Sequence, residues 1–270
     1  MFRRKTLMYI QQIEIDTDAL NRADLPASQA YLRTLPLLRG LDSGGVLQLQ
    51  LDSPVTFITG ENGTGKSTLI EAAAVSFGFN PEGGSKNFTF STSTRASHAE
   101  LYRFLRLVKS TRRPRDGYFL RAESYFNVAT QIERLDDAPG DPSPKIIGGY
   151  GNQSLHEQSH GESFLSLMQN RFFGRGLYML DEPEAALSPT RLMTMLILLR
   201  DLTARDSQFL ISTHSPILMA YPDAQIYEIT ESGIRLTPYT QTASYVLTKR
   251  FLTDPQSILE TLLNESPLSD

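Results

Sequence analysis

The apolar positions along the chain fall into short runs and helical stripes that alternate after residue 50. Residues 46–51 alternate between apolar and polar, and residues 54–59 are mostly apolar, which predicts two strands leading into a glycine-rich turn. From Ser67 to Phe77, apolar residues recur at helical spacing and end at Gly78, so this segment is predicted to be a helix. Residues 80–97 are rich in small polar residues and glycine, which is typical of a loop.

The second half of the chain continues this alternation. Residues 99–108 and 117–128 look strand-like or mixed, and residues 136–151 look like a long polar loop. We then expect helices at about 162–172, 189–204, 215–220 and 254–264, and strands at 176–180, 208–212 and within 225–236. Strands alternating with helices predict an α/β fold with a largely parallel sheet covered on both faces.

The composition excludes several classes of protein but does not identify the function. The net charge of −4 excludes a uniformly basic nucleic-acid binder, and the absence of cysteine excludes disulfides, thiolate zinc sites and cysteine nucleophiles. The first ten residues lack the apolar core of a signal peptide, and no apolar run approaches the roughly 18 residues that span a membrane. We therefore expect a soluble, cytoplasmic protein without membrane insertion.

A phosphate-binding motif lies between the strand at 54–59 and the helix that follows it. The segment reads Gly60-Glu61-Asn62-Gly63-Thr64-Gly65-Lys66-Ser67-Thr68. Glycines at these positions let backbone N–H groups curl around a β-phosphate, and the helix directs its positive end at the same point. Lys66 is expected to reach the β- and γ-phosphates of a nucleotide, and Ser67 to offer its hydroxyl to Mg²⁺.

Two later apolar strands also end in polar residues that suit this chemistry. The run at 176–180 ends in Asp181-Glu182, where Asp181 is expected to hold Mg²⁺ and Glu182 to polarise an attacking water. The run at 209–212 is followed by His214, which is a candidate for sensing the γ-phosphate or the attacking water. If the strands are neighbours in one sheet, these side chains converge on Lys66.

A second anion-binding helix start is predicted about 20 residues before Asp181. The segment Gln158-Ser159-His160-Gly161-Glu162-Ser163 forms a polar turn, and Ser159 and Gly161 are placed to open the helix that follows. Taken alone, it is equally compatible with an ordinary capped helix.

Together, these segments resemble an ATP-binding-cassette (ABC) ATPase over roughly residues 45–220. GENGTGKST resembles Walker A, SHGES a divergent cassette signature, LYMLDEP Walker B, the segment from Glu184 to Pro189 the D-loop, and STHSP the switch-histidine segment. The motif sequences are similar to those of soluble RecF- and SMC-like heads and of stand-alone predicted ATPases of the AAA_21 group. Residues 117–127 in particular resemble the stand-alone group.

The resemblance implies one Mg²⁺-dependent ATPase domain over residues 1–270. Its core would span about 45–236, with an N-terminal antiparallel β portion, an inserted lobe at 80–160 that leads to the signature, and a C-terminal helical tail at 237–270. Two chains would form a homodimer around two ATP molecules, each held by Walker A of one chain and by Ser159 and Gly161 of the other. Lys66, Glu182 and His214 would then act in catalysis.

The sequence departs from the family pattern in two places. The signature lacks the usual double glycine, because His160 takes one place and Glu162 replaces the glutamine. There is no clear Q-loop glutamine; its region offers Arg121 and Glu123, of which we favour Glu123 as a residue facing Mg²⁺ or water. Tyr31 and Arg39 are both candidates for stacking on adenine.

A basic segment leaves nucleic acid open as a partner. Between residues 103 and 115 there are six basic residues and no acid: Arg103, Arg106, Lys109, Arg112, Arg113 and Arg115. Such segments are more often simply solvated. The candidate role is therefore DNA maintenance, repair or defence, together with a partner protein that the sequence does not identify.

Three other functions are weighed against this one. A transporter nucleotide-binding subunit would carry a standard signature and Q-loop, which are absent here. A P-loop kinase or GTPase would need an acceptor pocket or a guanine-recognition motif, and we find none. A regulatory module that binds ATP with little turnover would carry the same motifs, so only turnover distinguishes it.

Overall fold

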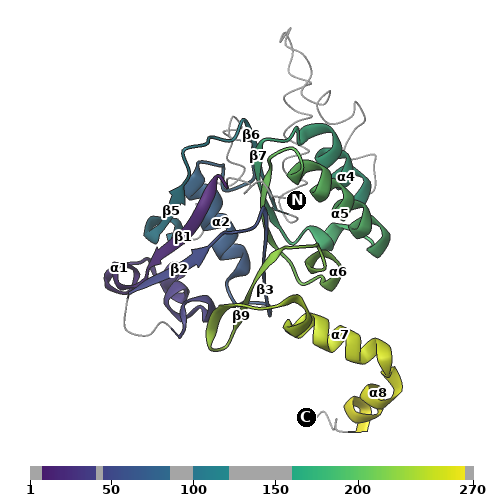
Figure 1. Cartoon of the computed structure of the whole chain (residues 1–270). Coiled ribbons are helices and arrows are strands. Elements are labelled where there is room, and N and C mark those ends of the chain that lie inside the picture. The colour runs from purple at the N-terminus through teal and green to yellow at the C-terminus, as the bar shows by residue number, and fades with distance from the viewer. Residues whose placement is uncertain (1–7, 41–44, 86–99, 122–159, 265–270) are drawn as a thin grey trace, which may run out of the picture.

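The chain folds around two β-sheets that lie on either side of one helix. The computed structural model describes residues 8–40, 45–85, 100–121 and 160–264, with the backbone alone described for 160–163. The larger sheet has the strand order β10-β9-β3-β8-β7-β6-β4, and the smaller has the order β2-β1-β5. The described residues thus confirm the predicted α/β class with a mostly parallel sheet and a separate antiparallel part (Figure 1).

Five neighbouring strands of the larger sheet run parallel. They are β9 (Gln225–Thr230), β3 (Val55–Gly60), β8 (Gln208–Ser212), β7 (Gly176–Asp181) and β6 (Asp116–Arg121). The antiparallel strands β10 (Gly233–Leu236) and β4 (Gly84–Ser85) form its edges. Because β3, β7 and β8 are buried along almost their whole length, they read as mostly apolar runs in the sequence.

Successive residues of the parallel strands enter two different cores. In β7, Leu177 and Met179 pack in one cluster, while Tyr178 and Leu180 pack in the other. This is the period-two alternation of a strand covered on both faces. The first core is covered by α2 (Lys66–Phe77), and the second by α4 (His160–Arg171), α5 (Pro189–Thr203) and α6 (Pro216–Met219), as Figure 1 shows.

The smaller sheet closes the first core from outside. Its strands β2 (Val46–Gln50), β1 (Ile10–Asp16) and β5 (Leu105–Lys109) are all antiparallel, and α1 (Thr17–Arg22) follows β1. Of the two interpretations for residues 99–108, strand-like or mixed, the structure has the mixed one, since Glu100–Phe104 form a 3₁₀ helix before the strand begins at Leu105. Leu101 of this turn is fully buried, so packing overrides a weak local preference.

Two helices at the end of the described chain extend away from the sheets (Figure 1). α7 (Ala243–Thr253) begins where the Ala243 N–H donates to the buried carboxylate of Glu228, 2.7 Å away, and α8 (Pro255–Asn264) follows it. The apolar pattern indicated only α8 as a separate helix, whereas the helical tail expected over 237–270 contains both α7 and α8. Further 3₁₀ segments lie at Ala27–Thr34, Pro36–Leu38, Pro183–Ala186 and Tyr239–Gln241. Among the described residues, no helix combines the length and apolar character needed to cross a bilayer.

One buried side chain joins the two sheets. The Gln208 Oε1 atom accepts from the backbone N–H groups of Tyr9 and Ile10, at 2.8 and 2.9 Å, and its Nε2 donates to the Ile10 carbonyl at 2.8 Å. The amide therefore substitutes for a strand partner at the start of β1. Because these groups are buried, leaving them without partners is costly.

We predict that Gln208→Ala destabilises the fold by about 2–4 kcal/mol, because three buried backbone groups lose their partner. Urea unfolding of the full chain measures this. Gln48→Ala, at an exposed position of β2, is the control and is expected to change stability by less than about 0.5 kcal/mol. Equal effects of the two substitutions would contradict the bridging role of Gln208.

Candidate functional site

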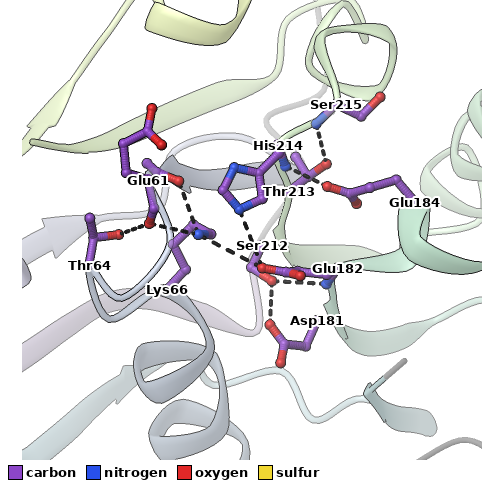
Figure 2. A network of polar contacts seen from close by, with 11 residues as sticks. Glu61, Thr64, Lys66, Asp181, Glu182, Glu184, Ser212, Thr213, His214 and Ser215 are labelled. Atoms are coloured by element: carbon purple, nitrogen blue, oxygen red, sulfur yellow. Dashed lines mark hydrogen bonds and ion pairs between the residues drawn. The ribbon is translucent and has the colours of Figure 1, made fainter. Parts of the chain in front are cut away.

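The predicted site residues gather where three adjacent parallel strands end. Gly60 ends β3, Asp181 ends β7 and Ser212 ends β8, and Ser212 is the register partner of both Asp181 and Ile58. The carboxyl edge of an open α/β sheet is where such folds bind ligands. Figure 2 shows the side chains from these strand ends directed toward one another.

The loop between β3 and α2 depends on glycine. Gly60, Gly63 and Gly65 have φ angles of 148°, 79° and 105°, which other residues rarely adopt. A side chain at Gly60 would place its Cβ 2.6 Å from the Ile229 carbonyl oxygen. The loop is also held from outside, because the Leu37 N–H donates to the Thr64 carbonyl at 3.2 Å.

Lys66 is the first residue of α2 and is almost fully buried. Its Nζ donates to the carbonyls of Gly60 and Glu61, at 3.0 and 3.1 Å, and lies 3.8 Å from Glu182 Oε1. Burial lowers the pKa of the ammonium, and the carboxylates around it, Glu182 first, act in the opposite direction. The side chain is thus a cation held at the mouth of the loop.

Ser67 and Asp181 form the pair of oxygen donors that the sequence assigned to Mg²⁺. The Asp181 carboxylate accepts from the hydroxyls of Ser212 and Ser67. Burial raises the pKa of Asp181, and these two hydrogen bonds partly offset the rise. Among the described residues no group of three or more histidine or acidic side chains could hold a metal ion. A hydroxyl and one carboxylate fit Mg²⁺, which keeps several waters and takes its other ligands from phosphate.

Glu182 adopts the left-handed conformation, with φ 50° and ψ 55°. Its N–H donates to the carbonyl and the hydroxyl of Ser212, at 3.2 and 3.0 Å, and Pro183 disfavours the right-handed helical conformation for the residue before it. Backbone strain of this kind is maintained only where neighbours fix it, and it is common at functional sites. Here it leaves the carboxylate 36% exposed at the site.

His214 approaches the same Glu182 oxygen as Lys66. Its Nε2 is 3.4 Å from Glu182 Oε1, and its backbone N–H donates to Glu184 Oε1 (Figure 2). Burial raises the pKa of Glu184, and the hydrogen bond from His214 opposes this rise. One oxygen of the Glu182 carboxylate therefore lies near both a lysine and a histidine, and such a carboxylate can orient a water molecule.

A pocket of about 250 Å³ opens beside this cluster. It is lined by Tyr31, Leu35, Asn62, Gly63, Gly65, Lys66, Ser67, Thr68 and Glu182. Tyr31 is 44% exposed and hydrogen-bonds to Thr68, so its ring is available to a ligand. Arg39 does not line this pocket and instead pairs with Glu231 in the β9–β10 turn. Of the two candidates for stacking on a base, the geometry favours Tyr31.

Some predicted residues are not placed here. Ser159 and Glu123 lie outside the described residues, and of Gly161 only the backbone is described, in the first turn of α4. Arg121 ends β6 opposite Asp181 and pairs with Glu71 of α2 at 2.8 Å. Burial raises the pKa of Asp181, and the positive charge of Arg121 opposes part of that rise, so Arg121 contributes to the electrostatics of the site.

Two family models match successive parts of the chain. AAA_23, described as an AAA domain, matches residues 39–141, which include the loop and Lys66. AAA_21, described as "AAA domain, putative AbiEii toxin, Type IV TA system", matches residues 149–220, which include Asp181, Glu182 and His214. Both models describe AAA domains, and their matches agree with the resemblance of the motifs to ABC-type P-loop ATPases of the RecF- and SMC-like kind. No curated protein sequence matches it.

The chain is also similar to solved structures. The SMC head domain from Thermotoga maritima is 17% identical, with a TM-score of 0.41, covering 86% of this chain and 99% of that chain. SmcHead bound to the C-winged helix domain of ScpA is 14% identical, with a TM-score of 0.48 and coverages of 85% and 98%. MJ1267, an ATP-binding cassette of an ABC transporter, is 17% identical, with a TM-score of 0.48 and coverages of 93% and 98%.

Sequence reasoning missed the residues that position the others. Ser212 bonds to both Asp181 and Glu182, and Glu184 holds the backbone of His214. Both lie in segments that resemble family motifs, so the motifs marked the segments but not these two roles.

We predict that Tyr31→Ala weakens binding of a fluorescent ATP analogue by about 5- to 100-fold, because stacking a base on an aromatic ring contributes about 1–3 kcal/mol. Arg39→Ala is the matched control and is expected to leave the affinity unchanged, since Arg39 does not line the pocket. Fluorescence anisotropy measures both. A larger loss in the Arg39 variant would assign the base to the other side of the loop.

Proposed function

We propose that the chain is a Mg²⁺-dependent ATPase that dimerises on ATP. The observation that carries the proposal is the position of Glu182, whose Oε1 lies 3.8 Å from Lys66 Nζ and 3.4 Å from His214 Nε2. A carboxylate held beside the phosphate-binding lysine suits a residue that orients or deprotonates water. A module that only binds ATP has no need for such a group.

The chain's own residues supply most of the proposed catalysis. Backbone N–H groups of residues 60–65 and the Lys66 ammonium would bind the β- and γ-phosphates. Glu182 would accept a proton from the attacking water, and His214 would orient the Glu182 carboxylate and contact the γ-phosphate. Ser67 and Asp181 would hold Mg²⁺, which neutralises charge on the phosphates.

Dimerisation is proposed because the signature segment around Ser159 serves a nucleotide held by another chain in the family that this sequence resembles. Within this proposal, ATP joins two chains and hydrolysis separates them. Ser159 and Gly161 would complete each site from the partner. A cytoplasmic location, a partner protein and a role in DNA maintenance, repair or defence stay predictions.

The basic segment supports nucleic acid less strongly than its composition suggested. Arg103 pairs with Glu100, Arg106 with Glu14 and Arg112 with Asp206, and Lys109 lies over the Phe77 ring at 4.7 Å. Structural pairing thus accounts for most of these cations. Two of the six, Arg113 and Arg115, have no such pairing within the described chain.

We predict that Glu182→Gln lowers the rate of phosphate release by about 100-fold or more, because the amide cannot accept a proton from water. ATP affinity is retained, so the variant accumulates as an ATP-bound dimer. Phosphate release and light scattering in MgATP measure the two effects.

The control for this prediction is Glu231→Gln, a change of the same charge at a carboxylate that is 85% exposed. It is expected to keep wild-type turnover. Wild-type turnover in the Glu182 variant would remove Glu182 from the mechanism, and a wild type without hydrolysis would leave a binding module.

We also predict complementation between two inactive variants. Lys66→Ala disables the loop, and Ser159→Arg disables the signature, so neither protein alone hydrolyses ATP. Mixing them restores turnover, because a mixed dimer has one site with an intact loop and an intact signature. Absence of restored turnover in mixtures shown to form mixed dimers would mean that Ser159 does not act across the interface.

A further inference from the structure

A second, larger pocket lies at the opposite edge of the parallel sheet. Its volume is about 760 Å³, and its lining is Arg115, Asp116, Arg171, Phe173, Gly174, Arg175, Ala204, Arg205 and Asp206. These residues precede or begin β6, β7 and β8, whereas the P-loop site lies where β3, β7 and β8 end. The six residues of β7 separate the two pockets by roughly 17–20 Å.

The two acids of this pocket are already occupied. Asp116 accepts from Arg171 at 3.0 Å, from the Tyr178 hydroxyl at 2.7 Å and from the Phe173 N–H at 3.2 Å. Asp206 pairs with Arg112 at 3.3 Å. Both carboxylates therefore already have an arginine partner.

The remaining cations have no comparable partner. Within the described residues, the side chains of Arg115 and Arg175 make no hydrogen bond or ion pair, and Arg205 donates its Nε only to the Asp201 carbonyl of its own helix. The lining holds four arginines against two aspartates, so the pocket is positive in a chain whose net charge is −4. Arginine presents a planar fork that matches phosphate oxygens.

The backbone holds these arginines in place. Gly174 and Arg175 have φ angles of 85° and 51°, and the Arg175 N–H donates to the Arg205 carbonyl at 2.7 Å. The Arg115 N–H donates in turn to the Arg175 carbonyl at 2.9 Å. Left-handed backbone at an arginine is uncommon and is kept where neighbouring structure fixes it. These bonds join three arginine-bearing segments that are distant in the sequence.

An aromatic ring lies beside the arginines of this pocket. Phe173 is 64% exposed, and the Arg171 guanidinium carbon lies 5.5 Å from the centre of its ring. An exposed phenylalanine next to phosphate-binding arginines is the arrangement by which proteins stack a base while holding its phosphate. The pocket volume falls in the ordinary range for ligand sites.

We infer that this pocket is a second anion site that binds the phosphate of a nucleotide unit through Arg115, Arg175 and Arg205, with its base on Phe173. The unit can come from a free nucleotide or from a single nucleic-acid strand, which share this chemistry. The site does not depend on hydrolysis at the P-loop. It is also distinct from the paired cations Arg103, Arg106 and Lys109 of the basic segment.

The test uses the full chain with two probes. A 5′-phosphorylated deoxythymidine hexamer, labelled at its 3′ end, is titrated by fluorescence anisotropy, and thymidine 5′-monophosphate competes with it. All titrations contain an excess of a non-hydrolysable ATP analogue and Mg²⁺, so that the P-loop does not take up the probe. The hexamer is expected to bind, with an affinity that falls as salt rises.

The variants remove the unpaired cations without disturbing the turn. Arg115→Gln and Arg175→Asn are combined, because asparagine tolerates the left-handed backbone at residue 175. The double variant is expected to bind the hexamer about tenfold or more weakly, since each hydrogen bond to a charged group contributes about 1.5–3 kcal/mol. Arg115→Gln alone gives a smaller loss and is the fallback if the double variant does not fold. Arg22→Gln, an exposed arginine at the end of α1, is the matched control and is expected to bind as wild type.

The possible outcomes separate the sources and decide the inference. Competition by the monophosphate identifies a free nucleotide as a sufficient ligand, and hexamer binding without competition identifies a strand; either result supports the site. No binding of either probe, or equal affinity in the wild type and the double variant, overturns it. MgATP hydrolysis, measured separately, is expected to be unchanged in the double variant, so failure here is distinguishable from failure of the proposed ATPase.

Discussion

The parallel pairing of β3, β8 and β7 is the constraint on which the site depends. Parallel strands present their carboxyl ends at one edge, so residues more than a hundred positions apart in the sequence are brought together without long side chains. Lys66 follows β3, Asp181 and Glu182 follow β7, and His214 follows β8. A shift of register by one residue would turn each strand end to the opposite face and separate these groups.

Short side chains at the strand ends then set the finer geometry. Ser212 bonds to Asp181 and to the backbone of Glu182, so one hydroxyl fixes both acids relative to β8. Glu184 does the same for the backbone of His214. At the opposite edge of the same strands, Asp116 and Asp206 are each paired with an arginine, and the pocket has further arginines without an acidic partner among the described residues. The sheet thus presents an acidic edge, where the proposed catalytic residues lie, and a basic edge, and the six residues of β7 join the two edges.

Much of this arrangement could be predicted from the sequence, because local patterns carry it. The buried strands before Gly60, Asp181 and Ser212 are mostly apolar runs, and the glycines of the loop are needed by its backbone. The 3₁₀ turn at Glu100–Phe104 could not be predicted, since it depends on burial of Leu101 by distant elements. Nor could the start of α7, which depends on Glu228. Gln208 looks like an ordinary polar strand residue, and only the fold shows that it joins two sheets.

Phosphate release by the wild-type chain in MgATP and in EDTA, with and without single- and double-stranded DNA and alongside a measurement of molecular mass, addresses the proposed activity most directly. The geometry of Lys66, Asp181, Glu182 and His214 predicts Mg²⁺-dependent release and a doubling of mass in ATP. Absence of phosphate release under all these conditions, from a folded chain that binds ATP, would contradict the assignment of Glu182 to hydrolysis.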